Sequence, residues 1–296
     1  MKTNILVLSK DDWANSGTKI AEAVNSLDDH CAECFVLNGT PFDYNRKILK
    51  DQKKSYVMEW IDKADLIIYK GDDGLIDPFG GYKIPVNKPI MVLFSGSTFL
   101  DKHKKILNDM SPRVDIIGAM RPDLLFSKNI KYIPHPVDCE YWKPVERKNE
   151  KIVIGHSVSN DVQRALKGTK LIENVVKQFD VEYSFIYKKS YEEARKMKQR
   201  CDIYIDNVGF RFYGNNGAES MALGIPTLTG LSESIIESGM ADIFGSTYID
   251  KHNIYGVLDK LINDIDKLFF NGRDARKWAL KMHSYESVGK RIVGLV

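Results

Sequence analysis

The sequence contains no long apolar run, and this absence excludes one class of protein. Its uninterrupted apolar stretches fall short of the roughly 18 residues that a membrane-spanning helix needs. The first of them, at 4–9, is also shorter than the core of a secretory signal and is followed at once by Lys10, Asp11 and Asp12. We therefore expect a cytoplasmic protein without a transmembrane segment.

The sequence is also poor in net charge and in cysteine. Its 43 Lys and Arg against 40 Asp and Glu leave a net charge of +3, too little to indicate a nucleic-acid partner. Among the four cysteines, Cys31 and Cys34 form a Cys-Ala-Glu-Cys pair, which is typical of half a zinc site or of a redox pair. Because no second Cys or His pair follows, we expect reduced structural thiols and no metal, with a metal or redox role as the alternative.

Short apolar runs alternate with helical patterns from end to end. We expect strands at 4–9, 33–37, 65–69, 89–94, 114–117, 152–155, 181–187, 202–206, 227–228 and 247–249. Helical patterns occur at 18–26, 58–63, 168–179, 191–200, 218–223 and 233–238, and over most of the tail from 253. Strands joined through helices rather than hairpins indicate an α/β fold with doubly wound parallel sheets. The lack of a Gly-x-Gly-x-x-Gly after the first strand of either half argues against a dinucleotide-dependent oxidoreductase.

A break in this alternation marks a domain boundary. Three prolines fall between 132 and 144, and the charged run 146–151 follows them. A chain of 296 residues is long enough for two domains with separate cores. We expect a first domain over 1–145 and a second over 146–275.

The second half contains the strongest candidate site. The expected strand 202–206 is followed, before the next helix, by Gly214, Asn215, Asn216 and Gly217. Open α/β sheets bind ligands at the carboxyl ends of their strands, and the amides and dipole at a helix start suit a phosphate. The two glycines let a ligand approach the backbone closely.

Charged side chains just after this turn, and after the first strand of the second half, suit the rest of a nucleotide. Glu219 can accept two hydrogen bonds, as from the vicinal hydroxyls of a ribose, and helix capping is the alternative. Arg164 and Lys167, one helical turn apart, can neutralise a diphosphate, and a solvated basic loop is the alternative. Tyr187, which ends the expected strand 181–187, is a candidate contact to the base.

These residues carry a resemblance to the GT-B glycosyltransferases, specifically the retaining family 4 type. The matching elements are Lys167-Gly-Thr, Tyr213-Gly with Glu219 five residues on, Met-Ala-Leu-Gly-Ile-Pro at 221–226, a linker with Trp142 and Pro144, and His283-Ser-Tyr-Glu-Ser-Val. The resemblance spans 132 to about the C-terminus. It implies two Rossmann-like domains facing a cleft, with a C-terminal helix at 276–296 packing back on the first domain.

The resemblance also implies a reaction and roles for single residues. Glu219 would hold the ribose of a nucleoside diphosphate sugar, by default a UDP-sugar, and Arg164 and Lys167 would take its diphosphate without a metal or other cofactor. The family has a second glutamate eight positions before Glu219, where this sequence has Arg211, which would contact the donor sugar or diphosphate. The sugar would pass to an acceptor hydroxyl with retention. A non-catalytic nucleotide-sugar or glycan-binding relative is the alternative.

The first half supplies further candidates. Ser16 and Gly17 after the first strand are candidates for donor binding, whereas Asp72 and Asp73 after the third strand and Ser95, Gly96 and Ser97 after the fourth are candidates for the acceptor side. The first pair resembles the loop over the donor phosphates, and the last three resemble a His-Gly-Ser segment, with Ser95 where a histidine often stands. Polar turns and a helix N-cap explain the same residues as the alternative.

Two basic clusters also lie in the first half: Arg46, Lys47, Lys50, Lys53 and Lys54, and Lys102, Lys104 and Lys105. They suit an anionic surface such as a membrane or a nucleic-acid backbone, and a solvated helix face is the alternative. The family resemblance implies an envelope or lipid-linked glycan as the acceptor. Because the chain is short for that fold, a hydroxymethylated base in DNA, of the kind found in modified phage genomes, is the other acceptor that we expect.

Overall fold

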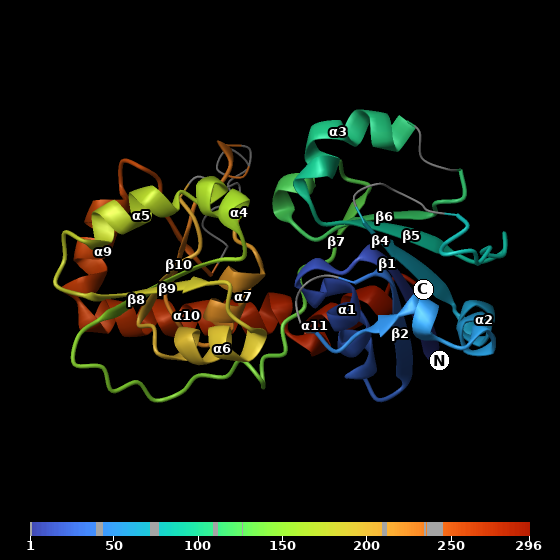
Figure 1. The fold of residues 1–296 in the computed structure, drawn as a ribbon, viewed down its shortest axis with the longest axis horizontal. Helices are drawn as coiled ribbons and strands as arrows, with labels where there is room; N and C mark the ends of the chain where they lie inside the picture. Colours follow the sequence, from blue (N-terminus) through green and yellow to red (C-terminus); the bar gives the residue numbers. More distant parts are fainter. Residues whose placement is uncertain are drawn as a thin grey trace. The chain divides into compact units, whose positions relative to one another are not determined.

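The computed structural model describes residues 2–39, 44–71, 77–108, 112–125, 127–208, 212–233, 235 and 245–296. The chain divides into two compact units, one of Met1–Pro136 with Ser284–Val296 and one of Val137–His283 (Figure 1). The segment after Pro136 belongs to the second unit because Trp142 is fully buried there, and Arg276 Nη1 donates to the carbonyl oxygens of Cys139 at 3.0 Å and Trp142 at 3.1 Å. The change of unit thus precedes the expected boundary at 145.

The first unit is built on a parallel sheet. Its described strands run in the order β3-β2-β1-β4-β5-β6-β7. Their bounds are β1 Thr3–Asp11, β2 His30–Asn38, β3 Lys47–Ile48, β4 Leu66–Lys70, β5 Ile90–Phe94, β6 Ile116–Ala119 and β7 Ile130–Tyr132. The five strands expected in this half all overlap observed strands, and the short β3 and β7 were not expected.

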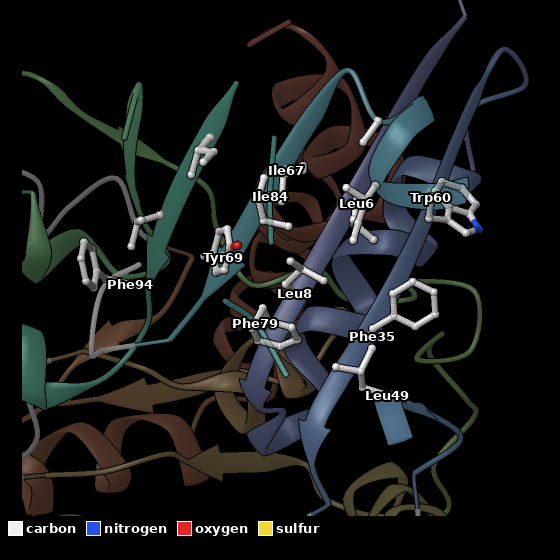
Figure 2. Packing of buried hydrophobic residues seen from close by; sticks show 14 of the residues in the cluster. Leu6, Leu8, Phe35, Leu49, Trp60, Ile67, Tyr69, Phe79, Ile84 and Phe94 are labelled. Atoms are coloured by element: carbon white, nitrogen blue, oxygen red, sulfur yellow. The ribbon is translucent and has the colours of Figure 1, made fainter. Parts of the chain in front are cut away.

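Both faces of this sheet are buried, as its continuous apolar runs require. In β1, Leu6 and Leu8 point into one cluster, whereas Ile5 and Val7 point into another. Figure 2 shows the first cluster, where Leu6 and Leu8 lie near Phe35 of the neighbouring strand. The helices are α1 Ser16–Asn25, α2 Lys54–Lys63, α3 Ser97–Asn108 and α11 Tyr285–Val293, with short 3₁₀ turns η1 Trp13–Asn15, η2 Leu49–Asp51 and η3 Pro122–Leu124. Helices α2 and α3 cover the first cluster, and α1 and α11 cover the second.

The second unit has a smaller parallel sheet. Its described strands run in the order β12-β11-β10-β8-β9. Their bounds are β8 Val153–Val158, β9 Glu182–Tyr187, β10 Ile203–Ile205, β11 Thr227–Thr229 and β12 Thr247–Tyr248. The helices are α4 Asp161–Leu166, α5 Thr169–Val176, α6 Tyr191–Gln199, α7 Asn215–Ala222, α9 Ile254–Ile262 and α10 Ile265–His283. In Figure 1, α4 and α5 lie on one side of this sheet, and α6 and α10 lie on the other.

Two expected helix boundaries in this unit differ from the structure. The helix expected at 218–223 begins earlier, because Gly214 is its N-cap residue and Asn215 its first helical residue. Glycine and asparagine are poor helix formers, so their presence at 214–217 suggested a loop. The basic segment before the helix expected at 168–179 forms α4, separated from α5 by Gly168 in the left-handed conformation (φ 71°).

None of the helices in the described part of the chain is both long and apolar enough to cross a membrane.

Candidate functional site

The candidate site of the second unit lies at the carboxyl ends of β8 and β10. Asp206 follows β10, and its side chain is almost completely buried. Its Oδ1 lies 2.9 Å from Nζ of Lys167, and its Oδ2 accepts the amide N–H of Gly214 at 3.1 Å. Asp206 therefore joins Lys167 to the residue that caps α7.

Lys167 is the better buried of the two predicted diphosphate ligands. It is 6% exposed, and Nζ donates to Asp206 and, at 3.3 Å, to the carbonyl oxygen of Ser157. Burial would raise the pKa of Asp206, but the charge and hydrogen bond of Lys167 outweigh it, so that this pKa is lowered. The pair is thus an ion pair at neutral pH, and a lysine ammonium has a third donor for a ligand.

Arg164, the second predicted diphosphate ligand, has a different environment. Its side chain is 46% exposed, and Nη2 lies 3.2 Å from Glu173 Oε1. Its guanidinium carbon lies 5.3 Å from the centre of the Phe185 ring. Arg164 is therefore held over β9 with its donors accessible to solvent, which suits a ligand arriving from outside.

The start of α7 has the features expected of an anion site. Asn215 and Asn216 are its first two residues, so their amides have no carbonyl partner within the helix. Within the described part of the chain, the buried Oδ1 of Asn215 also has no hydrogen-bond partner. A Cβ on Gly217 would lie 2.8 Å from Cβ of Tyr213, whereas one on Gly214 would meet nothing within 4 Å. Close packing therefore requires glycine at 217 and not at 214.

Glu219 is in the first turns of α7, as predicted, but it is 4% exposed and already ion-paired. Its Oε2 lies 2.6 Å from Nζ of Lys198 in α6, and the same Nζ donates to Oδ1 of Asn216 at 2.6 Å. Lys198 was not expected among the site residues, because the pattern at 191–200 indicated only a helix. The available signal was its position seven residues after Tyr191, on the same face of the helix.

His156 and Tyr187 are anchored by contacts within the unit. His156 is fully buried, with Nδ1 2.8 Å from the carbonyl oxygen of Ile205 and Nε2 2.8 Å from Thr169 Oγ1. Since a carbonyl only accepts, Nδ1 carries the proton and Nε2 accepts from Thr169. Burial first, and then Lys167, lower the pKa of His156 to about 4. Tyr187 donates its hydroxyl to Asp161 at 2.9 Å.

In the first unit, Asp12 occupies the position at which a ligand was expected. Its Oδ1 accepts the amide of Gly17 at 2.6 Å, and its Oδ2 accepts the amide of Thr18 at 3.1 Å. Asp12 is fully buried and lies 3.7 Å from Nζ of the buried Lys70. Ser16 is buried as well, and the amides of Gly17 and Thr18 at the start of α1 are satisfied by the chain's own carboxylate.

The remaining predicted residues lie in the first unit or outside the described residues. Ser95 and Gly96 follow β5 and are half-buried, and Ser97 begins α3. Asp72, Asp73 and Arg211 fall outside the described residues.

The basic clusters are only partly free for an external partner. Lys47 pairs with Glu33 and contacts Tyr56, and Arg46 Nη1 lies 3.5 Å from the carbonyl oxygen of Asp12. The side chains that are exposed are those of Lys47, Lys50, Lys53, Lys54, Lys104 and Lys105, while that of Lys102 is not among those described.

The cysteines are free thiols. Cys31 and Cys34 lie three positions apart on β2 and therefore face opposite sides of the sheet, one toward each core cluster. Burial raises the pKa of Cys139 to about 11 and that of Cys201 to about 12. In the part of the chain that the structure describes, no three His, Cys, Asp or Glu side chains gather as ligands for a metal.

The chain is similar to known proteins in its structure, and not in its sequence. No family model and no curated protein matches the sequence. An α-glucosyltransferase in complex with UDP-glucose and DNA containing an abasic site matches with a TM-score of 0.64 and 8% identity, over 100% of this chain and 99% of that one. HepE of Anabaena in complex with UDP and glucose matches with a TM-score of 0.65 and 11% identity, over 99% of both chains.

A sucrose-phosphate synthase of Thermosynechococcus elongatus matches with a TM-score of 0.63 and 12% identity, over 99% of this chain and 98% of that one. At such identities the likeness shows the fold alone. The chain has the GT-B fold of glycosyltransferases, and the predicted fold class is confirmed.

Proposed function

We propose that the protein is a glycosyltransferase that moves a sugar from a nucleoside diphosphate sugar, by default a UDP-sugar, to an acceptor hydroxyl with retention. The observation that carries this proposal is the arrangement around Asp206. A buried lysine and the start of α7 are joined by one carboxylate at the carboxyl edge of a parallel sheet. This is the place where open α/β sheets bind nucleotides.

The arrangement suits the chemistry of a departing diphosphate. The amides of Asn215 and Asn216, the dipole of α7, and the cations Lys167 and Arg164 are groups that stabilise negative charge as it develops on the leaving group. Lys167 is held by Asp206 and Ser157 before any ligand arrives, so little reorganisation is needed. We propose that these groups take the place of a metal ion, so that a chelator should leave the rate unchanged.

The solved structures of the same fold support a uridine donor. HepE has been solved with UDP-glucose as well as with UDP, and the α-glucosyltransferase with UDP-glucose. In our proposal, Glu219 contacts the ribose, Tyr187 lies toward the base, and Arg211 contacts the sugar or the diphosphate. Ser16 and Gly17 contact the donor, and residues at 72–73 and 95–97 line the acceptor side.

For the acceptor we retain two classes, a lipid-linked or envelope glycan and a hydroxymethylated base in DNA. The second is favoured by the fold shared with an α-glucosyltransferase solved with DNA. The exposed lysines at 50–54 and 104–105 suit either anionic acceptor. Transfer of labelled glucose to hydroxymethylated DNA and to lipid-linked glycan, measured side by side, distinguishes the two.

The test of the donor site is calorimetric titration with UDP, GDP, ADP and UDP-glucose. We expect binding of one nucleoside diphosphate, and Arg164→Met should weaken it by about tenfold or more, because a hydrogen bond between charged groups is lost. Arg200→Met is the matched control, since Arg200 is likewise exposed and paired, with Glu182. This control should change affinity by less than about twofold.

Three other outcomes have separate meanings. Wild-type protein that binds no nucleotide would contradict the proposed function. Binding without hydrolysis or transfer of UDP-glucose would favour the non-catalytic alternative. If the wild type and Arg164→Met bind the nucleotide with equal affinity, Arg164 does not contact the diphosphate, and the rest of the proposed function is unaffected.

A further inference from the structure

We propose that Lys198 is a positioning residue that gives the site its preference for ribonucleotides over deoxyribonucleotides, by holding Glu219 and Asn216 on one face of α7. This inference rests on the proposed function. It concerns a residue in α6, outside the strand ends and the helix start that form the candidate site.

Lys198 extends from α6 to the first turns of α7. Its side chain is 1% exposed, and Nζ lies 2.6 Å from Glu219 Oε2 and 2.6 Å from Asn216 Oδ1. Residues three apart in a helix share a face, so one ammonium can hold both side chains at once. The oxygen Oε2 is thereby held in place, which limits the orientations open to the carboxylate.

The lysine is itself confined by aromatic rings. Nζ lies 5.0 Å from the ring centre of Trp142 and 5.6 Å from that of Tyr204. The Trp142 ring is fixed in turn, because its Nε1 donates to the hydroxyl of Tyr191 at 2.8 Å. Tyr191 begins α6, the helix that carries Lys198. The ammonium therefore lies between the rings and the two acceptors.

Stability alone does not account for this ion pair. Moving a lysine and a carboxylate out of water costs several kcal/mol for each charge, and well-packed apolar residues often stabilise a fold as well as a buried ion pair does. What the pair supplies beyond stability is a fixed carboxylate orientation. A fixed carboxylate binds a vicinal diol without losing side-chain freedom on binding.

The expected consequence is a preference for ribose. A hydrogen bond to a charged group contributes about 1.5 to 3 kcal/mol, and about 1.4 kcal/mol corresponds to a tenfold change in affinity. A hydrogen bond from a hydroxyl to a carboxylate should therefore strengthen binding by about tenfold or more. We expect the wild type to bind UDP about tenfold or more tightly than 2′-deoxy-UDP. Lys198→Met should reduce this ratio to near one, while changing the affinity for 2′-deoxy-UDP by less than about threefold.

The experiment is calorimetric titration of both nucleotides into the wild type, Lys198→Met and the matched control Lys196→Met. Lys196 is in the same helix, but its side chain is 70% exposed, so the control should keep the full preference. Because Lys198→Met leaves Glu219 buried without its lysine, Glu219→Gln and the double variant Glu219→Gln/Lys198→Met are measured as well. The double variant lacks both buried charges and should remain folded.

Each outcome has a distinct meaning. If the wild type binds no UDP, the proposed function itself fails. If it binds both nucleotides equally, the positioning proposal is overturned while the proposed function stands. A folded Lys198→Met protein with undiminished preference also overturns it. So does a double variant that binds UDP more than about threefold more weakly than Glu219→Gln, since Lys198 would then act independently of Glu219.

Discussion

At the scale of single residues, the second unit contains buried ionisable groups that form hydrogen bonds with other residues of the same unit. His156 is hydrogen-bonded to Ile205 and Thr169. Lys167 is hydrogen-bonded to Asp206, and Lys198 to Glu219. Each partner is on another segment of the chain. Neutralising or charging one of these groups therefore changes the stability of the unit and not only its surface charge.

His156 should make stability depend on pH. Its pKa is about 4 in the folded protein, against about 6.5 in an unfolded chain. As the pH falls below about 6.5 the unfolded chain takes up a proton first, so stability is lost until about pH 4 and then levels off. We expect the free energy of unfolding in urea to fall by about 2 kcal/mol between pH 7 and pH 5 on account of this residue.

The control is His156→Gln, which retains hydrogen-bonding groups but has no proton to gain. Its free energy of unfolding should lack this share of the pH dependence. Identical slopes for the wild type and the variant would show that His156 does not titrate as assigned.

At the scale of elements, the first turns of α7 are held by two buried ion pairs. Asp206, paired with Lys167, accepts the amide of Gly214, and Lys198 holds Glu219 and Asn216. These contacts come from the end of β10, from the end of α4 and from α6. The helix start is therefore preorganised in the absence of a ligand, as an anion site should be.

The two glycines at this helix start should respond differently to a methyl group. Gly217→Ala places Cβ 2.8 Å from Cβ of Tyr213, closer than such atoms approach. We expect it to cost about 1 to 3 kcal/mol in chemical denaturation, as overpacking of a core does. Gly214→Ala is the control, because its Cβ meets nothing within 4 Å and its φ of −95° suits alanine.

Gly214→Ala should change stability by no more than about 0.5 kcal/mol. Similar small effects for both variants would mean that α7 moves easily away from Tyr213, contrary to a rigid helix start.

At the scale of the whole molecule, the last residues of the chain complete the first unit. Val288 and Ile292 of α11 belong to the same buried cluster as Ile20 and Val24 of α1. The hydroxyl of Tyr285 also donates to Glu22 Oε2 at 2.5 Å. The second unit, 137–283, is thus inserted within the sequence of the first, whose core is complete only when the C-terminus is in place.

A methyl group between α1 and α11 should test this packing. A Cβ on Gly289 would lie 2.3 Å from the backbone oxygen of Ala23, which cannot rotate away as a side chain can. We expect Gly289→Ala to lower the free energy of unfolding by about 1 to 3 kcal/mol. The matched control is Gly256→Ala in α9, where a Cβ meets nothing within 4 Å.

Gly256→Ala should stabilise the protein by about 0.5 to 1 kcal/mol, since alanine favours a helix interior over glycine. Urea denaturation measures both variants, and a stabilised Gly289→Ala protein would show that α11 does not pack closely on α1.

The sequence by itself determined the α/β architecture, because apolar runs such as 4–9 and 89–94 must be buried on both faces and so predict parallel strands. It also predicted that Gly214 and Glu219 follow the strand at 202–206 and that Lys167 follows the strand at 152–155, since local order sets where a strand ends and a helix begins. Only the tertiary structure decided what these side chains bond to. Lys167 and Asp206 are 39 residues apart, and Lys198 and Glu219 are 21 apart.

The same reason explains what sequence reasoning missed. Whether a lysine of a charged helix is exposed, as Lys196 is, or buried, as Lys198 is, depends on which face packs against Trp142 and Tyr204. At the start of α1, Asp12 folds back to take the amides that a ligand was expected to bind. Pattern and spacing determine local structure, whereas burial and pairing are decided by residues distant in the chain that the fold brings together.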